Sequence, residues 1–383
     1  MYCIGILNPR STLYPSIGFD ILNGLKAGIK KCGFDKEIAF VTENIGFGID
    51  EAEIFAKAEK MLLEHNADAV IAYCDVRIAE LLQPMFTATN KLLVVVNPGA
   101  NFPNNWQPAP TTITHTLNLC FHSYMIGSLL GDSNAAIVAS YYDAGYRQIY
   151  STVKKLGRQG GNILFNHITA LKTKDFSLEP LNNYLKTENA TQNLVCHFCA
   201  DMATQFYENI QTIQAEHECN LYVSAMMLDE LLKQGLGNDI VIKNVKGFTS
   251  WLSSLENESN ESFKAFYKEI FGKEVNIFAL LGWEIALLLE EYFKNLQGNN
   301  CDGAIHEMSK KIYESPRGWL KLDAQTHQTY GQAYLVKAEN NFELTVLTQA
   351  QTNWDELWRD FVAQSVFGEN EINSSWRNTY LCI

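Results

Sequence analysis

The stretch AVIAYCDVRIAELLQPMFTATNKLLVVVNPGAN, residues 69–101, determines the fold class. Ala69–Tyr73 is a short apolar run with β-branched residues, which predicts a buried strand. Apolar residues then recur at helical spacing, at Ile78, Leu81, Leu82 and Met85. Leu92–Val96 predicts a second buried strand, which ends at the turn cluster Asn97–Asn101. Two buried strands joined by one helix form a parallel βαβ unit, because parallel neighbours need a crossover connection.

The two loops of this unit are the first candidates for a binding site. In parallel sheets, ligands bind outside the carboxyl ends of the strands. Cys74–Arg77 follows the first strand, and Asn97–Asn101 follows the second. We therefore expect the two loops to lie side by side at the rim of one crevice.

The composition is that of a folded protein without a nucleic-acid or membrane partner. The chain has 383 residues, enough for two domains. Its apolar content of 47% and its charged content of 19% are ordinary for a folded soluble protein. The net charge of −13 argues against nucleic acid and anionic membranes, because both need basic patches. No apolar run approaches the ~20 residues of a membrane span.

The first residues and the cysteines bear on location. Met1–Leu7 already resembles a core strand, and no basic segment with an apolar leader precedes it. The nine cysteines cannot all pair within the chain, and Cys3, Cys74 and Cys196 fall in apolar runs, as reduced buried thiols do. These features predict a cytoplasmic protein. A periplasmic location is the alternative, if a signal segment was removed before this sequence was recorded.

Strand and helix patterns alternate along most of the chain. They run through residues 1–118 and restart with a helix at Leu117–Leu130. Trp319–Leu322 and Ala333–Ala338 are predicted to pair as a late hairpin. Thr352–Phe367 predicts an amphipathic tail helix. Two α/β halves, each with its own sheet, are the simplest architecture, and the crevice between them is a natural ligand site.

Four segments together resemble the type I periplasmic-binding-protein superfamily, in its branched-chain amino-acid and amide-binding branch. The first is GILNPRSTLYPSIGFDILNGLKAGI, residues 5–29, and the second is the opening stretch with its turn at Asn97–Asn101. The third is SFKAFYKEIFGKEVNIFALLGWEIALLL, residues 262–289, and the fourth is the region 315–336. The similarity covers about residues 2–338.

This resemblance implies an α/β fold of two Rossmann-like lobes with parallel sheets flanked by helices, joined by three crossovers. Lobe I would hold residues 2–117 and 250–328, lobe II residues 118–249 and 329–345, and the tail residues 346–383. The implied role is non-enzymatic: a small polar metabolite, such as an amino acid or amide, is captured as the lobes close about a hinge. The protein would serve an ABC transporter or act as a sensor, without cofactor or metal. Its partner would be an ABC permease or a cytoplasmic regulatory protein, and a homodimer is compatible with either role.

On lobe I the resemblance assigns the ligand to three loops, which contribute Arg10, Ser11 and Tyr14; Cys74 and Asp75; and Asn97, Gly99, Ala100 and Asn101. Converging N–H donors and helix N-termini are what hold a ligand carboxylate. Arg10 would pair with a carboxylate or stay a solvated loop charge. Asp75 would receive an ammonium or hydroxyl group, although capping the next helix is the favoured role.

On lobe II and the last crossover it assigns Tyr142, Tyr146, His197, Ser224, Met226 and Trp251. Tyr142 or Tyr146 would cover the ligand. Ser224–Met226 stands where relatives often place an acidic residue for an ammonium group, and its lack of charge makes a branched-chain amino acid an unsafe guess. Trp251 would stack on the ligand or pack in the hinge.

Other functions have weaker support. Cys196–Cys199 is a single CxxC, followed by His217 and Cys219, whereas zinc needs about four such ligands. An enzyme on this fold would have to use Cys74, Asp75 and His197. A third possibility is a regulatory module whose tail helix docks a partner.

Overall fold

The computed structural model describes residues 1–237, 240–296, 298, 300–347, 352–366, 376 and 379–381. Its first sheet has five parallel strands in the order β2-β1-β3-β4-β5. They are β1 (Tyr2–Asn8), β2 (Ile38–Asn44), β3 (Ala69–Tyr73), β4 (Leu92–Asn97) and β5 (Thr112–Thr116). The predicted βαβ unit is confirmed, since β3 pairs in parallel with β4 through helix α3 (Val76–Thr89).

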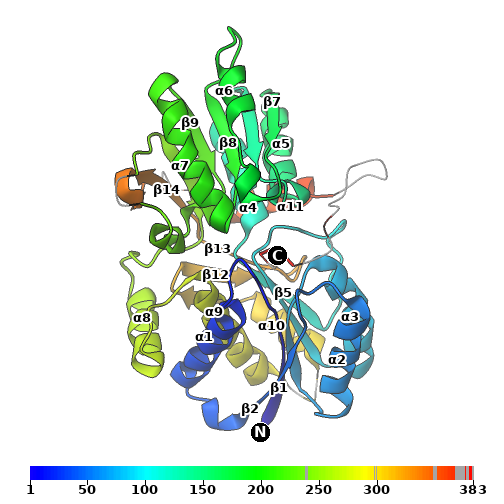
Figure 1. Ribbon diagram of the computed structural model, residues 1–383. Helices are drawn as coiled ribbons and strands as arrows, with labels where there is room; N and C mark the ends of the chain where they lie inside the picture. The colour runs from blue at the N-terminus through cyan, green and yellow to red at the C-terminus, as the bar shows by residue number, and fades with distance from the viewer. Residues whose placement is uncertain are drawn as a thin grey trace.

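Helices cover both faces of this sheet (Figure 1). Helices α1 (Ile17–Cys32) and α9 (Ile277–Asn295) pack on the face that carries Ile4, Ile71 and Val94. Helices α2 (Glu51–Leu63) and α3 pack on the other face, which carries Val70 and Val95. Successive strand residues point to opposite faces. The sheet is therefore buried on both sides, and this explains its continuous apolar runs.

The second sheet has seven strands in the order β15-β14-β10-β9-β8-β6-β7. Its parallel strands are β6 (Ala135–Ala139), β7 (Ile163–Ile168), β8 (Asn193–His197), β9 (Asn220–Val223) and β10 (Val245–Thr249). β14 (Tyr334–Glu339) and β15 (Glu343–Val346) complete it as antiparallel strands. Its helices are α4 (Leu119–Leu130), α5 (Gln148–Arg158), α6 (Glu179–Leu185) and α7 (Ala200–Glu216).

The predicted late hairpin is wrong. Residues Gly318–Leu322 form β12, which pairs with β11 (Ile312–Ser315) and β13 (Thr329–Gly331) in a small third sheet. The partner assumed for it, β14, instead pairs with β10 of the second sheet. The chain therefore turns back from β12 to β13 within the third sheet, and it crosses to the second sheet between β13 and β14. The boundaries assigned to the two lobes by residue number stay a prediction.

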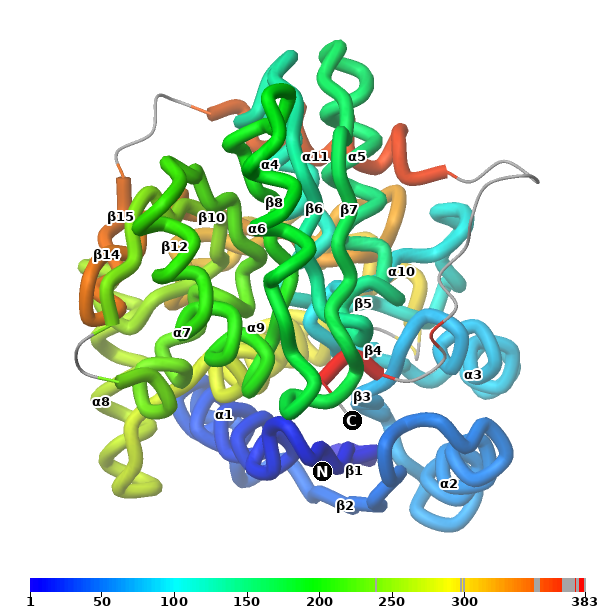
Figure 2. The backbone as a smooth tube through the Cα atoms, turned by 45° about the horizontal axis from the view of Figure 1, so that its top comes forward, coloured from blue at the N-terminus to red at the C-terminus, as the bar shows by residue number. Residues whose placement is uncertain are grey.

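Helices α8 (Glu258–Phe271), α9 and α10 (Cys301–Ser309) follow β10 and lie on the side of the first sheet (Figure 2). A buried ion cluster fixes this region. Arg317 Nε donates to Glu284 Oε1 at 2.7 Å, and His115 Nε2 lies 3.2 Å from Glu284 Oε2. All three side chains are fully buried. The cluster therefore ties β5, α9 and the segment before β12 to one another.

The predicted tail helix is confirmed as α11 (Trp354–Gln364). Its apolar face lies on α4, where the Trp358 ring meets Phe121 at 5.3 Å and the Phe361 ring meets Tyr124 at 5.5 Å. Asp360 accepts a hydrogen bond from Lys155 Nζ at 2.7 Å. The face on which partner docking was hypothesised is therefore covered by lobe II. Among the described residues, no helix combines the length and apolarity that crossing a membrane requires.

Candidate functional site

The carboxyl-terminal residues of the chain lie between the two large sheets. Figures 1 and 2 both draw this red segment between the lobes, near the carboxyl ends of the strands. Thr379 and Leu381 have no exposed surface, and Tyr380 is 2% exposed. The loops that the sequence assigned to a ligand therefore surround part of the chain itself.

On the lobe I side, two hydroxyl groups hold the backbone of this segment. Ser11 Oγ donates to the carbonyl oxygen of Leu381, and Tyr73 Oη donates to that of Tyr380 at 3.2 Å. Ser11 Oγ also accepts the backbone N–H of Tyr14 at 2.9 Å, which fixes the first loop. The Tyr14 ring packs edge-on against Phe278, with ring centroids 5.0 Å apart. Two hydroxyl donors thus define an acceptor-binding end of the cleft.

On the lobe II side, the Tyr380 ring sits among aromatic side chains. It stacks on Tyr142 at 5.9 Å with an interplanar angle of 17°, and it meets Tyr146 edge-on at 4.7 Å. Trp376 covers the same pair of tyrosines, and its Nε1 donates to the Tyr142 carbonyl oxygen at 2.7 Å. The two tyrosines predicted to cover a ligand therefore lie together and enclose a phenol ring.

Asp143 receives the phenol hydroxyl. Tyr380 Oη donates to Asp143 Oδ1, and Ser140 Oγ donates to Asp143 Oδ2 at 2.5 Å. Burial raises the pKa of the Asp143 carboxyl, whereas the hydrogen bonds from Ser140, Tyr380 and Cys199 act to lower it. The sequence analysis passed over Asp143 in favour of its tyrosine neighbours. It lies in the loop after β6, four residues beyond Ala139, and no local pattern marks it as buried.

Asp229 is a second buried carboxyl group that the sequence analysis missed. It lies three residues beyond Met226, is 6% exposed, and accepts the backbone N–H of Leu231 at 3.1 Å. Burial raises the pKa of Asp229 to about 7. Burial also raises the pKa of Tyr14, and the charge of Asp229 adds to that shift. Lobe II therefore carries a buried acidic group close in sequence to the uncharged Ser224–Met226.

Asp75 and the third loop form a separate hydrogen-bond network. Asp75 caps α3 by accepting the Val76 N–H at 2.8 Å and also accepts Asn101 Nδ2 at 2.6 Å. Burial raises the pKa of Asp75 to about 6 against these hydrogen bonds. From lobe II, the backbone N–H of Arg147 donates to Ala100 O at 3.0 Å. The favoured capping role of Asp75 agrees with this geometry.

The loop backbone is held by its own polar groups. Asn97 Nδ2 donates to Cys74 O at 2.9 Å, and Asn97 Oδ1 accepts the Gly99 N–H at 2.8 Å. Gly99 has a φ of +82°, which favours glycine. These residues shape the loop that follows β4.

Four other predicted site residues lie away from the Tyr380 ring or have their polar groups engaged elsewhere. Arg10 is exposed. Trp251 Nε1 donates to Asn260 Oδ1 at 2.8 Å, which agrees with the hinge-packing alternative. Ser224 Oγ donates to Phe198 O at 3.4 Å, and Met226 is fully buried in the core.

The catalytic alternative has no support in this geometry. Cys74 follows Tyr73 on the opposite face of β3 and is buried against α2 and α3, where burial and Asp75 raise the pKa of its thiol. The ring nitrogens of His197 have no hydrogen-bond partner in the part of the chain that the structure describes. Burial lowers the pKa of His197 to about 3. A buried protonated thiol supplies no nucleophile.

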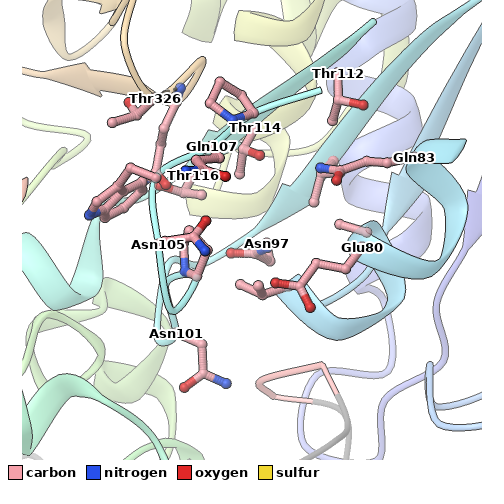
Figure 3. Close-up of a pocket in the computed structure, with 17 residues that line it drawn as sticks. Glu80, Gln83, Asn97, Asn101, Asn105, Gln107, Thr112, Thr114, Thr116 and Thr326 are labelled. Carbon is pink, nitrogen blue, oxygen red and sulfur yellow. Dashed lines mark hydrogen bonds between the residues drawn. The ribbon is translucent and has the colours of Figure 1, made fainter. Parts of the chain in front are cut away.

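A hollow of about 200 Å³ adjoins the cleft on lobe I (Figure 3). Because side chains alternate along a strand, Thr112, Thr114 and Thr116 of β5 share the face that lines it. Glu80 and Gln83 of α3 lie across from them, and Asn97 and Asn101 complete the wall toward the cleft. Its lining mixes polar side chains with apolar ones such as Val95 and Trp106, and it includes one charged residue, Glu80. Across the described ranges, no three His, Cys, Asp or Glu side chains gather to hold a metal ion.

The comparisons with known proteins agree with this architecture. The sequence model of the periplasmic binding protein family matches residues 2–343. A solute-binding protein of an ABC transporter from Rhodopseudomonas palustris BisB5, in complex with 3,4-dihydroxybenzoic acid, superimposes with a TM-score of 0.73 at 18% identity, covering 93% of this chain and 99% of that one. A second R. palustris solute-binding protein, in complex with 4-hydroxybenzoate, gives a TM-score of 0.75 at 16% identity, with coverages of 92% and 98%.

A branched-chain amino-acid transporter substrate-binding protein from Streptococcus pneumoniae, in complex with isoleucine, gives a TM-score of 0.67 at 14% identity, with coverages of 91% and 99%. At such identities these likenesses show the fold. The comparison with curated proteins finds no match.

The family match corrects the predicted location. The expectation of a cytoplasmic protein is wrong, because the matched family is that of periplasmic binding proteins. The free cysteines misled the prediction: Cys74, Cys120, Cys196, Cys199, Cys219 and Cys301 are buried, and burial rather than a reducing compartment explains why such thiols stay unpaired. With two parallel-sheet lobes, an interlobe cleft and a family match over residues 2–343, this chain belongs to the periplasmic binding protein family.

Proposed function

We propose that this protein is the solute-binding component of an ABC transporter and that it captures a small phenolic compound in the cleft between its lobes. The observation that carries this proposal is the position of the Tyr380 ring. That ring lies between Tyr142 and Tyr146, with its hydroxyl group on Asp143. A free phenol of the same size would make the same contacts.

The polar groups at the two ends of the cleft favour one orientation of the ligand. Asp143 accepts a hydrogen bond from a hydroxyl group on the lobe II side. Ser11 and Tyr73 donate hydrogen bonds on the lobe I side, where they now hold carbonyl oxygens. Carboxylate oxygens accept hydrogen bonds from the same donors. A hydroxybenzoate therefore suits the cleft better than a branched-chain amino acid, which offers neither an aromatic ring nor a hydroxyl group.

The solved relatives support this choice of ligand class. The two R. palustris proteins are in complex with 3,4-dihydroxybenzoic acid and 4-hydroxybenzoate. Contacts from both lobes to one bound segment are also what capture by hinge closure requires. The ring is held from lobe II, whereas the backbone next to it is held from lobe I.

The test is a calorimetric titration with 4-hydroxybenzoate, 3,4-dihydroxybenzoate, benzoate and isoleucine. We expect the hydroxylated acids to bind at least about tenfold more tightly than benzoate, because only they satisfy Asp143. The titrations are made with the wild type and with the Trp376→Ala/Tyr380→Ala variant, which lacks the two aromatic side chains that lie on Tyr142 and Tyr146. Equal affinities for 4-hydroxybenzoate and benzoate, or binding of isoleucine alone, would contradict the phenolic assignment.

A further inference from the structure

We infer that the cleft is also the docking site of the chain's own carboxyl-terminal segment, Trp376 and Thr379–Leu381, and that this segment competes with the solute. The identity of the competing solute rests on the proposed function. The docking itself rests on the contacts of the segment alone. Docking of the segment would make the protein regulate access to its own binding site.

The segment makes specific contacts with both lobes. Its two backbone carbonyls accept the hydroxyl groups of Ser11 and Tyr73, and its phenol hydroxyl donates to Asp143. Trp376 Nε1 donates to the backbone of lobe II at 2.7 Å. Hydrogen bonds from opposite sides, together with nearly complete burial of Tyr380 and Leu381, are the features of a bound ligand.

Two glycines make room for the segment. A Cβ on Gly145 would lie 1.2 Å from Trp376 Nε1, so no other residue allows the indole to lie there. A Cβ on Gly48 would lie 2.2 Å from Thr379 Oγ1, and Gly48 also has a φ of +72°. The loops on both sides of the cleft are therefore shaped to fit the segment.

The segment lies beyond the part of the chain that matches the family, which ends at residue 343. Helix α11, which precedes it, is anchored on lobe II by Trp358, Phe361 and Asp360. Tethering an occupant next to its site raises its effective concentration, so modest contacts are enough to keep the cleft occupied. The region beyond residue 343 thus supplies both the anchor and the occupant.

Under competition, the apparent affinity for solute is the intrinsic affinity multiplied by the fraction of molecules in which the cleft is open. A segment docked in about nine molecules of ten would weaken solute binding about tenfold. Because the segment contacts both lobes, its docking also favours the closed arrangement in the absence of solute. Solute binding would therefore require the segment to leave first.

Three variants of the full chain test this inference. Gly145→Ala places a methyl group where the Trp376 indole lies, and Trp376→Ala/Tyr380→Ala removes the two aromatic side chains from the segment. Gly157→Ala in α5 is the matched glycine control, since nothing lies within 4 Å of its Cβ position. Val366→Ala controls for a change in the tail, because Val366 is 50% exposed. Circular dichroism and thermal melting verify that each variant folds.

Two binding measurements are made on each protein. Calorimetry measures the affinity for 4-hydroxybenzoate. Fluorescence anisotropy measures binding of a labelled peptide with the sequence of residues 374–383, in which Cys382 is replaced by serine. We expect the double variant and Gly145→Ala to bind 4-hydroxybenzoate at least about tenfold more tightly than wild type, with both controls unchanged. The peptide should bind to the double variant and not to the wild type.

The other outcomes separate the two proposals. If the peptide does not bind to the double variant and solute affinity is the same in all proteins, docking is overturned while the proposed function stands. If the peptide binds and no phenolic acid binds to any variant, docking stands and the proposed function fails. A solute affinity of the wild type that falls as protein concentration rises would assign the segment to a second copy, which overturns docking within one chain.

Discussion

Asp143 is a buried carboxyl group whose oxygens are hydrogen-bonded. Its side chain is 1% exposed, and it accepts hydrogen bonds from a serine and a phenol. A buried carboxyl group is costly unless such donors satisfy it. Under the proposed function, a ligand without a hydroxyl group at this position would leave the Asp143 acceptor unpaired, and this is the basis of the expected specificity.

Replacing Asp143 tests this specificity. In the Trp376→Ala/Tyr380→Ala background, Asp143→Ala should weaken 4-hydroxybenzoate binding by about 10- to 100-fold, the value of a hydrogen bond to a charged group. Binding of benzoate should change much less. Calorimetry measures both, and Asp175→Asn, an exposed carboxyl elsewhere on lobe II, is the control. Equal losses of affinity for the two ligands would show that Asp143 supports the fold and does not recognise the hydroxyl group of the ligand.

Asp229 makes the stability depend on pH. Burial raises its pKa from 3.8 to about 7, with Glu230 adding to the shift and the hydrogen bond from Leu231 opposing it. A raised folded-state pKa contributes stability that is complete below the unfolded value of 3.8 and is lost as the pH rises through about 7. Asp229→Asn keeps an acceptor for the Leu231 N–H and does not titrate. Relative to this variant, the wild type should lose a few kcal/mol of unfolding free energy between about pH 4 and about pH 8.

Urea unfolding of both proteins across this range measures the difference. Parallel pH profiles for wild type and Asp229→Asn would mean that Asp229 titrates alike in the folded and unfolded chain. Asp75, whose pKa is raised to about 6, acts in the same direction but is present in both proteins. The comparison therefore isolates Asp229.

The residues of the candidate site could be predicted only in part from the sequence. The resemblance assigned Ser11, Tyr142 and Tyr146 to a ligand; in the structure they contact Leu381 and Tyr380, and their contact with a ligand stays a prediction. Asp143 and Asp229 lie next to assigned residues, and nothing in their local pattern separates a buried carboxyl from a solvated one. The occupation of the cleft by Tyr380 depends on a contact across more than 200 residues, which no local pattern encodes.

At the scale of elements, the packing of α1 on α9 depends on small residues. A Cβ on Gly282 would lie 1.9 Å from the Ile21 carbonyl oxygen, and one on Gly24 would lie 1.9 Å from the Ala279 carbonyl oxygen. Because these neighbours are backbone atoms, the helices would have to separate. The glycines therefore set the distance between two helices that cover one face of the first sheet.

Gly282→Ala should lower the free energy of unfolding by about 1–3 kcal/mol, the usual cost of overpacking. Gly157→Ala is its matched control, since it also replaces a helical glycine but meets nothing within 4 Å. That variant should be unchanged or more stable by about 0.5–1 kcal/mol, because alanine favours the helix. Urea unfolding measures both. Equal effects of the two substitutions would show that the α1–α9 contact relaxes without cost.

Apolar periodicity predicted the elements whose burial is local and failed where burial depends on a distant partner. β3, α3, β4 and α11 carry continuous or periodic apolar residues, and all four form as predicted. β5 has the sequence TITHT, and its polar residues are buried because the His115 side chain meets Thr329 and Glu284 and the Thr116 backbone N–H donates to Thr329. The late hairpin failed for the same reason, since β14 pairs with the distant β10 rather than with β12.

At the scale of the whole molecule, the buried ion cluster joins two of the connections between the sheets. Arg317 Nη2 donates to Thr116 O at 3.3 Å, and Nη1 donates to Asn118 Oδ1 at 3.5 Å, both at the exit from the first sheet. Tyr334 Oη, at the return to the second sheet, donates to Arg317 O at 2.9 Å. We expect such an anchor to let the lobes move about it as units during the proposed hinge closure.

Glu284 should be essential to this anchor. Burial raises the pKa of Glu284, but Arg317 and His115 outweigh it and lower the value to about 2. Such a group contributes stability that is present above its unfolded pKa of 4.5 and is lost as the pH falls through about 2. Glu284→Gln leaves the Arg317 charge buried without its counter-ion, which costs about 3–5 kcal/mol. Glu290→Gln, which breaks the exposed pair with Lys294, should cost less than about 1 kcal/mol.

The double variant Glu284→Gln/Arg317→Met distinguishes an ionic anchor from mere packing. If the loss in Glu284→Gln comes from an unpaired buried charge, removing that charge should restore part of the stability. The double variant should then unfold at a higher urea concentration than Glu284→Gln alone. If instead the two substitutions add, each side chain contributes by packing, and the cluster is no electrostatic unit. In that case small-angle scattering with and without 4-hydroxybenzoate should show the same closure in wild type and double variant, because the hinge would not depend on the charges.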